Sequence, residues 1–450
     1  MVAQRARLIS HGASKEHGAL LGSGAASPAS SARSGTFTDN MKLPIHRWYR
    51  YSAGFSAQWA ESVILSHQTG ARICVLDPFA GSGTAVIAAE KAGAHAIGLE
   101  SHPFVARIAQ AKLMWRSARP SDLRAAAAQL IARAAAGMGA ARKRTKPAAV
   151  SPLLLKCYTA GALTSLFSLR DEFLHSPPAD PAVRELLWLA ITAILRSCSH
   201  VGTAQWQYVL PRKRKASTRD PFLALEAKIT ELIADIEHAS RSAITTQAQV
   251  IVQDARVPLT LADASIDLVV TSPPYPNNYD YADATRLEMT FWGEIDSWGD
   301  LQDAVRKFII RSCSQHSAAE QLQLDDLLAL DVVKPIVAEL APVCRMLEKV
   351  RLTRGGKKTY HTMVAAYFAD LAQVFRVLRP VCRRGSRLCF VIGDSAPYGI
   401  YVPTHDWLGR LAVSAGFHGC RFEKLRDRNI KWKNRKHRVP LQEGRLWIEG

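Results

Sequence analysis

Two short segments of the 450-residue chain combine residue types that could bind a ligand and activate it. The first reads Asp77, Pro78, Phe79, Ala80, Gly81, Ser82, Gly83 and Thr84. Its two glycines allow the backbone to approach a ligand closely, and Glu100, on the next expected strand, could accept hydrogen bonds from both hydroxyls of a ribose. The three-glycine turn of dinucleotide sites and the Lys-Ser/Thr pair of a P-loop are both missing. The segment therefore predicts a nucleoside site and disfavours dinucleotides and triphosphates.

The second segment is a buried strand that stops at two prolines. It runs over 266–271 and continues as Ser272, Pro273, Pro274 and Tyr275. Because proline cannot extend a strand ladder, the strand end becomes a rigid ledge at the carboxyl edge of the sheet, where ligands bind in open α/β folds. The ledge would present the hydroxyl of Ser272, backbone carbonyl oxygens and the ring of Tyr275.

Such a ledge suits chemistry on the exocyclic amine of a nucleic-acid base. The amine is a poor nucleophile because its lone pair is delocalised into the ring. Acceptors at Ser272 Oγ and at the Pro273 carbonyl could favour the pyramidal form of the amine, each hydrogen bond contributing about 1 kcal/mol. Tyr275 could stack on a base swung out of a duplex and so offset the unstacking cost. The ledge predicts catalysis by orientation, without a covalent intermediate.

In sequence, these two segments together resemble the S-adenosylmethionine-dependent DNA amino-methyltransferases, the family of cytosine-N4 and adenine-N6 enzymes. The resemblance covers 45–115, 246–290 and 359–450. It implies that the glycine turn holds the amino-acid part of S-adenosylmethionine and that Glu100 holds the ribose. It also implies that Phe55 closes over the cofactor methionine and that Asp254 contacts the adenine amino group, although Gln253 stands where the family usually has glycine. The predicted cofactor-binding residues are thus Phe55, Asp77 to Thr84, Glu100 and Asp254, and the predicted catalytic residues are Ser272 to Tyr275.

The first residue of the ledge favours one base over the other. Ser-Pro-Pro-Tyr is similar to the motif of cytosine-N4 enzymes, whereas adenine-N6 enzymes more often have Asp or Asn in place of Ser272. Methylation of cytosine carbon 5 is disfavoured because that family uses a cysteine after a proline, and the chain has no Pro-Cys pair. We therefore expect a site-specific DNA methyltransferase acting on cytosine N4. Adenine-N6 methylation, methylation of RNA or protein glutamine, and a nucleic-acid-binding module without activity stay open as alternatives.

The charge of the chain favours a polyanionic partner. Lys and Arg number 58 against 39 Asp and Glu, a net charge of +19, which draws a protein towards nucleic acid through counterion release. DNA contacts are expected in two basic stretches and just after the ledge. The predicted nucleic-acid-binding residues are Arg212, Lys213, Arg214, Lys215, Tyr279, Tyr281, Lys431, Lys433, Arg435 and Lys436. A restriction nuclease is a further expected partner.

Other classes of protein are excluded by composition. Charged residues interrupt every apolar run before it reaches about eighteen residues, so a membrane-spanning helix is not expected. The eight cysteines contain no Cys-x-x-Cys pair, which favours reduced, mostly buried thiols without a disulfide framework or a zinc site. These features predict a cytoplasmic enzyme that binds neither a metal nor a membrane.

Alternating strands and helices must position the two motifs. Strands are expected at 72–77, 95–100, 249–253, 266–271, 387–392 and 446–448, and helices at 84–92, 125–135, 182–198 and 222–239. This alternation predicts an α/β fold with a mainly parallel, Rossmann-like sheet of the class I methyltransferase type, interrupted by a helical insertion and a second, smaller insertion. The glycine turn and the proline ledge should then face each other across adjacent strand ends.

Composition predicts six parts along the chain. A disordered tail covers 1–40, the cofactor-binding half of the core 41–116, a helical insertion 117–245, the catalytic part of the core 246–289, a mobile loop or insertion for target recognition 290–358, and the rest of the core with a basic segment 359–450. Two basic breaks are expected between the helices of the first insertion, at 142–147 and 211–221.

Overall fold

The computed structural model describes residues 37–68, 70, 72–139, 150–203, 208–241, 246–277, 279–355, 358–428 and 440–450. Within these residues a seven-stranded sheet has the order β5-β2-β1-β6-β7-β9-β8. Its strands are β1 (Cys74–Asp77), β2 (His95–Glu100), β5 (Ala248–Val252), β6 (Ile266–Thr271), β7 (Cys382–Gly393), β8 (Gly419–Arg428) and β9 (Leu441–Glu449). The first five strands in this order are parallel, and β9 and β8 run antiparallel to their neighbours. The predicted α/β fold with a mainly parallel, Rossmann-like sheet is confirmed.

The central strands are apolar on both faces because helices cover both faces. Val75 belongs to the hydrophobic cluster on one side of the sheet and Leu76 to the cluster on the other. The same alternation separates Leu268 and Val270 from Val269. Side chains of successive strand residues point to opposite faces, so a strand buried on both sides reads as one continuous apolar run. This is why the apolar runs could be recognised as strands.

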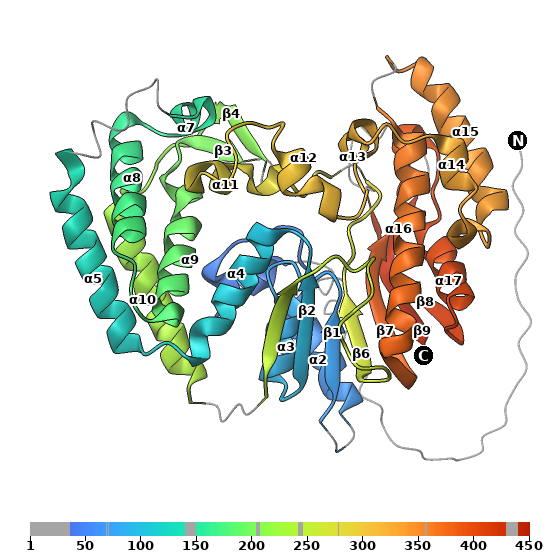
Figure 1. The fold of residues 1–450 in the computed structure, drawn as a ribbon, viewed down its shortest axis with the longest axis horizontal. Coiled ribbons are helices and arrows are strands. Elements are labelled where there is room, and N and C mark those ends of the chain that lie inside the picture. The colour runs from blue at the N-terminus through green and yellow to red at the C-terminus, as the bar shows by residue number, and fades with distance from the viewer. Residues whose placement is uncertain are drawn as a thin grey trace, which may run out of the picture.

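Different helices cover the two faces (Figure 1). One cluster includes residues of α2 (Ala57–His67), α3 (Thr84–Lys91) and α4 (Pro103–Leu113). The other includes residues of α16 (Tyr360–Val381) and α17 (Thr404–Ser414). Short 3-10 helices connect the larger elements: η1 (Thr38–Lys42), η2 (His46–Trp48), η3 (Met114–Arg116), η5 (Asp283–Thr285), η6 (Arg306–Phe308), η7 (Asp331–Val333) and η8 (Pro397–Gly399).

The first insertion forms a helical bundle beside the sheet (Figure 1). Its helices are α5 (Pro120–Ala136), α7 (Pro152–Cys157), α8 (Ala160–His175), α9 (Pro181–Cys198) and α10 (Pro221–Ala239). Helices α9 and α10 both start at an Asp-Pro pair, in which Asp180 or Asp220 accepts hydrogen bonds from the free backbone amides of the first turn. The bundle is tied to the core, because Asp235 of α10 accepts hydrogen bonds from the Arg47 guanidinium and the Trp48 indole.

A basic β-hairpin stands where the sequence analysis expected a break. Strands β3 (Val201–Thr203) and β4 (Val209–Arg214) pair antiparallel between α9 and α10. The basic break expected at 211–221 thus begins with residues of β4, and the helices are interrupted here by the hairpin. The other expected break, at 142–147, lies outside the described residues.

The second insertion is helical where a mobile loop was one expectation. It contains α11 (Arg286–Trp292), α12 (Leu301–Ala304), α13 (Ser314–Ala319), α14 (Leu324–Leu328) and α15 (Val337–Leu352). Leu340, Cys344 and Leu347 recur at three- and four-residue spacing and are fully buried in the cluster around α16. Of the two alternatives expected for 290–358, the described part has the helices of an insertion, and its apolar stripe packs on the core. A role in target recognition stays a prediction.

One smaller expectation, the extent of the N-terminal tail, also changes. Residues 37–40 belong to the fold rather than to a tail, since the buried Asn40 side chain bonds the Phe55 carbonyl and the Ala57 amide at 2.8 and 2.9 Å. Residues 1–36 lie outside the described residues. No helix among the described residues is long and apolar enough to cross a membrane.

Candidate cofactor and catalytic site

The glycine turn and the proline ledge lie side by side at one edge of the sheet. Strand β1, which leads into the turn, pairs directly with β6, which leads into the ledge, through Val75–Leu268 and Leu76–Val269. The hydroxyl of Thr271, the last residue of β6, donates to Asp77 Oδ1 at 2.5 Å. The predicted arrangement of the two motifs across adjacent strand ends is confirmed.

One pocket is lined by both motifs. Of the predicted site residues it takes in Phe55, Phe79, Ala80, Gly81, Ser82, Thr84, Glu100, Ser272, Pro274 and Tyr281. It also takes in Tyr51, Ala53, Gly54, Ser101, His102, Ile309 and Ile310, which the sequence analysis did not single out. Of these, Tyr51 falls inside the segment recognised around Phe55, whereas Ile309 and Ile310 come from the second insertion and had no local signal. Asp77, Pro78, Gly83, Asp254, Pro273 and Tyr275 are absent from the lining.

The glycine turn brings its backbone to the pocket wall. Gly81 and Gly83 have φ values of +52° and +87°, in the left-handed region that favours glycine. A Cβ at Gly81 would lie 3.2 Å from the ring of Tyr51, so a side chain there would crowd the pocket. The turn is therefore shaped for close approach of a ligand to backbone atoms.

Glu100 lies at the end of β2 with its carboxylate against the turn. Its Oε2 accepts from the Gly81 amide and its Oε1 from the His102 amide, both at 2.8 Å. Burial raises the pKa of Glu100 to about 7, against the opposing effect of the backbone hydrogen bonds from His102, Gly81 and Ser101. Each carboxylate oxygen has a second lone pair, so the group can still accept from hydroxyls of a ligand.

The buried carboxylate of Asp77 bonds both the glycine turn and the strand that leads into the ledge. It is 1% exposed, and its Oδ1 accepts from the Phe79 amide at 3.0 Å as well as from Thr271. Burial raises the pKa of Asp77 to about 7, while the hydrogen bonds from Thr271 and Phe79 lower it and the charge of Glu100 raises it further. Asp77 therefore positions the turn relative to the ledge without lining the pocket, and its predicted contact with a cofactor stays a prediction.

Asp254 has a different partner from the one implied by the resemblance. It follows β5 at the same edge of the sheet, but its carboxylate is held by the Arg256 guanidinium, with Nη2–Oδ2 at 2.6 Å and Nε–Oδ1 at 3.0 Å. Arg256 also bonds Asp370 of α16 at 3.1 Å. The described geometry thus gives Asp254 a role in an ion-pair network, and an adenine contact stays a prediction.

The proline ledge is braced by the neighbouring strand. Ser272 Oγ donates to the Val391 carbonyl of β7 at 3.2 Å, and as part of the pocket wall it keeps its own lone pairs as acceptors. The ring of Tyr275 lies under the guanidinium of Arg428, whose Cζ is 5.3 Å from the ring centroid. A Cβ on Gly393 would come within 3.1 Å of the same ring. The Tyr275 ring is therefore fixed in one place beside the pocket.

Tyrosine rings in the segment after the ledge pack on one another and on a tyrosine of the first insertion. Tyr279 packs edge-on against Tyr281 with centroids 4.5 Å apart, and Tyr208, just before β4, packs on Tyr279 at 5.3 Å. The Tyr208 hydroxyl also accepts from the Asp280 backbone amide at 2.6 Å. Of the two predicted tyrosines, Tyr281 lines the pocket and Tyr279 is buried between its neighbours.

The predicted basic residues divide into three groups. Arg212, Lys213 and Arg214 are exposed on β4. Lys215 is turned inward, since its ammonium donates to the Arg196 carbonyl and burial lowers its pKa. Lys431, Lys433, Arg435 and Lys436 lie outside the described residues.

Comparison with known proteins adds an independent line of evidence. A family model described as DNA methylase matches residues 28–111. Type II methyltransferase M.AvaI from Nostoc sp. and its namesake from Anabaena variabilis are each 27% identical over 410 residues, which cover 85% of this chain and 81% of the relative. Type II methyltransferase M.BsoBI from Geobacillus stearothermophilus is 21% identical over 443 residues, covering 87% of this chain and 82% of the relative. No solved structure gives a significant match.

Proposed function

We propose, from the premise that the chain belongs to the N4/N6 family of DNA methyltransferases, that it methylates the N4 amine of cytosine in DNA with S-adenosylmethionine as the donor. The observation that carries the proposal is that one pocket is lined by Gly81 and Glu100 of the cofactor motif together with Ser272 and Pro274 of the ledge. A methyl donor on one wall and an amine on the other would then be within reach of each other.

The cofactor side of the pocket fits S-adenosylmethionine through three features of the chain. The left-handed turn at Gly81 leaves room for a ligand against the backbone. The Glu100 carboxylate is an acceptor for ribose hydroxyls at the end of β2, the usual place for such a residue in nucleoside-binding α/β folds. The aromatic residues Tyr51 and Phe55 offer apolar cover from the N-terminal segment. When bound, S-adenosylmethionine supplies a methyl group activated by the sulfonium.

The ledge acts on the amine. Ser272 Oγ and the Pro273 carbonyl accept hydrogen bonds from its two N–H groups, and these bonds strengthen as the nitrogen becomes tetrahedral in the transition state. Orientation of the amine towards the methyl group supplies the rest of the rate enhancement. Tyr275 and Tyr281 hold the flipped base by their rings, because both lie at or beside the pocket and are fixed by packing.

The choice of cytosine rests on Ser272. The serine side chain is short and rotatable, and its hydroxyl can accept a hydrogen bond from the amine. The sequence Ser-Pro-Pro-Tyr resembles the catalytic motif of cytosine-N4 enzymes. Adenine N6 is the second candidate, because the same two acceptors would serve that amine equally well.

DNA is engaged by the exposed face of the β3–β4 hairpin. Arg212, Lys213 and Arg214 project from it, and the hairpin is joined to the segment after the ledge through Tyr208. Basic side chains at this place would bind phosphates and set the position of the duplex over the pocket. Lys215 has a backbone partner of its own and is not needed for this role. As the relatives are named Type II methyltransferases, we also propose that this chain protects sites cut by a partner restriction nuclease.

The test is to incubate the purified chain with isotope-labelled S-adenosylmethionine and either DNA or RNA, digest the product to nucleosides, and identify the labelled one by mass spectrometry. We expect N4-methylcytosine from DNA only, and much less of it in the same time from a Ser272→Ala variant. Labelled N6-methyladenine alone would overturn the assignment of cytosine as the target base. Label in RNA alone would overturn the assignment of DNA as the substrate. DNA binding without any labelled product would show a nucleic-acid-binding module without activity.

A further inference from the structure

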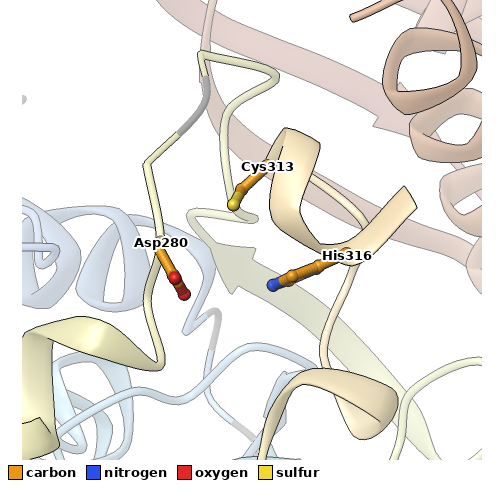
Figure 2. A group of neighbouring side chains, drawn as sticks. All are labelled: Asp280, Cys313 and His316. Carbon is orange, nitrogen blue, oxygen red and sulfur yellow. The ribbon is translucent and has the colours of Figure 1, made fainter. Parts of the chain in front are cut away.

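Three side chains able to bind a metal converge behind the catalytic segment. Asp280 lies between Tyr279 and Tyr281, Cys313 directly precedes α13, and His316 is on α13. One ligand atom from each lies within 4.8 Å of the other two, and all three residues are buried. Figure 2 shows the carboxylate, the sulfur and the imidazole pointing towards one another. None of the three lines the pocket of the proposed methyltransferase site.

His316 is the anomaly in this group. It is 0% exposed, yet neither Nδ1 nor Nε2 has a hydrogen-bond partner among the described residues. Buried polar groups in folded proteins are nearly always bonded, so an imidazole with two vacant nitrogens indicates a missing partner. Both ring nitrogens of His316 are thus available to a ligand inside the fold.

Asp280 and Cys313 have partners that leave room for a metal. Asp280 accepts from the Arg306 guanidinium at 2.7 Å through Oδ2, and from the Ala282 and Asp283 amides at 3.2 and 3.3 Å through Oδ1. Arg306 Nε lies at 3.2 and 3.5 Å from Oδ2 and Oδ1 as well. A carboxylate offers about four lone-pair positions, so a metal would take the place of this longer Nε contact while the Nη2 bond stays. Arg306 then orients the carboxylate as outer partners of metal ligands do. The Cys313 thiol donates to Gln315 Oε1 at 2.6 Å, a proton that a metal would displace.

We propose that Asp280, Cys313 and His316 bind a zinc ion. The combination of sulfur, nitrogen and one carboxylate oxygen is the donor set of Zn²⁺, whereas Mg²⁺ and Ca²⁺ take oxygen ligands. Tetrahedral bonds of about 2.0–2.3 Å place neighbouring ligand atoms about 3.3–3.8 Å apart, so the group closes with side-chain shifts of about 1 Å. On binding, the thiol proton leaves to solvent and the sulfur coordinates as thiolate.

The ion would fasten the catalytic segment to the second insertion. Asp280 is flanked by Tyr279 and Tyr281, and α13 packs on α16, so one metal would join the tyrosines to the helix that covers the sheet. The proposal does not depend on the methyltransferase assignment, because metal content is measured without any substrate. It assigns the zinc a positioning role, since its ligands do not touch the pocket.

The first test is the metal content of the purified full-length chain by mass spectrometry. We expect one zinc per chain in the wild type and loss of zinc in Cys313→Ser and in His316→Gln. Cys198→Ser is the matched control, because Cys198 is equally buried but belongs to the first insertion, and it should keep its zinc. A variant of Cys313 or His316 that folds and retains the full zinc content would overturn the proposal.

A second test covers the case in which the variants do not fold. The wild-type chain is stripped with a chelator and titrated with Co²⁺, which reports a thiolate ligand by a charge-transfer band in the near ultraviolet. We expect this band to saturate at one Co²⁺ per chain, and the chelator to lower the Tm in a way that added Zn²⁺ reverses. A wild-type chain that contains no zinc, shows no cobalt band and keeps its Tm in chelator would show that His316 is a packed histidine without a metal.

Discussion

The glycine turn, residues 78–83, and the tyrosine segment, residues 275–281, both follow parallel strands and both reach the same pocket, yet they are held in different ways. The turn is held by its own neighbourhood: the Asp77 carboxylate bonds the Phe79 amide, and Glu100 of the adjacent strand bonds the Gly81 amide. The tyrosine segment is held by distant parts of the chain, with Tyr208 from the first insertion, Arg306 from the second and Arg428 from β8.

This difference determines which of the two regions a short sequence motif can encode. A turn that needs only glycine at positive φ and an acidic residue one strand away can be encoded in a short motif. A segment that takes its shape from two insertions can change with each insertion while the ledge at its start stays the same. We therefore expect substitutions in the turn to alter cofactor binding alone, and substitutions around the tyrosine segment to alter the handling of the base.

The largest effect is expected at the ledge. Ser272→Ala removes an acceptor for the target amine and should lower kcat about 100-fold, with little change in cofactor affinity, because the bond strengthens only in the transition state. Single-turnover kinetics and calorimetry measure the two quantities. Ser62→Ala, on the exposed face of α2, is the matched control. Equal losses in kcat and in cofactor affinity would contradict the division between the two regions.

The next largest effect is expected at Asp77, whose carboxylate joins the glycine turn to the strand of the ledge. Asp77→Ala leaves the Phe79 amide and the Thr271 hydroxyl without an acceptor and should lower the free energy of unfolding by about 2 kcal/mol. Asp77→Asn keeps an acceptor oxygen and should lower it less. Denaturant titrations compare the three proteins. An unchanged free energy in Asp77→Ala would mean that turn and ledge are held independently.

Asp77 also makes stability depend on pH. Since burial raises its pKa from 3.8 to about 7, the folded chain holds this proton more tightly than the unfolded chain. Its stabilising contribution is complete below pH 3.8 and is lost as the pH rises through about 7. The difference in unfolding free energy between wild type and Asp77→Asn should therefore shift against the wild type over that range. A constant difference from pH 5 to pH 8 would refute the raised pKa.

A smaller effect sharpens the role of the turn in cofactor binding. Glu100→Gln leaves one acceptor oxygen where there were two and should weaken S-adenosylmethionine binding by about 10-fold without changing the methylated base. Because burial raises the pKa of Glu100 to about 7, the wild type should also lose affinity as the pH falls below 7, when the carboxyl is protonated and accepts less well. Calorimetry across this range should show no such added loss in the variant.

The smallest effect tests the link to the first insertion. Tyr208→Phe keeps the ring contact with Tyr279 but removes the acceptor of the Asp280 amide, a change of about 1 kcal/mol. We expect a fewfold fall in kcat with cofactor affinity intact. Tyr158→Phe, whose buried hydroxyl bonds the Leu195 carbonyl within the insertion, is the control for a simple loss of stability. Equal kinetic losses in both variants would remove the special role of Tyr208.

The sequence was most informative where a local rule applies. Strands β2 and β6 begin and end where the apolar runs do, because a turn or a proline closes each run. Strand β8 was missed because its Lys and Arg residues were interpreted as part of a basic segment that contacts phosphates. In the fold, charges of this strand are paired across the ladder, for example Glu423 with Arg445. The partner of Asp254 and the meeting of Asp280 with His316 depend on the folded arrangement of segments that no spacing in the chain relates. Cys313 and His316 stand three residues apart, a ligand spacing that the sequence analysis overlooked when it predicted no histidine beside the cysteines and no metal site.

The hydrogen bond from the Asp280 amide to Tyr208 has a consequence for engineering. Exchanging residues 117–245 for the corresponding part of a relative with another target would bring in a new hairpin together with whatever residue then faces Asp280. A chimera without a hydroxyl at this position would leave the Asp280 amide without its acceptor. The first insertion can therefore be exchanged only together with a residue that replaces the Tyr208 contact.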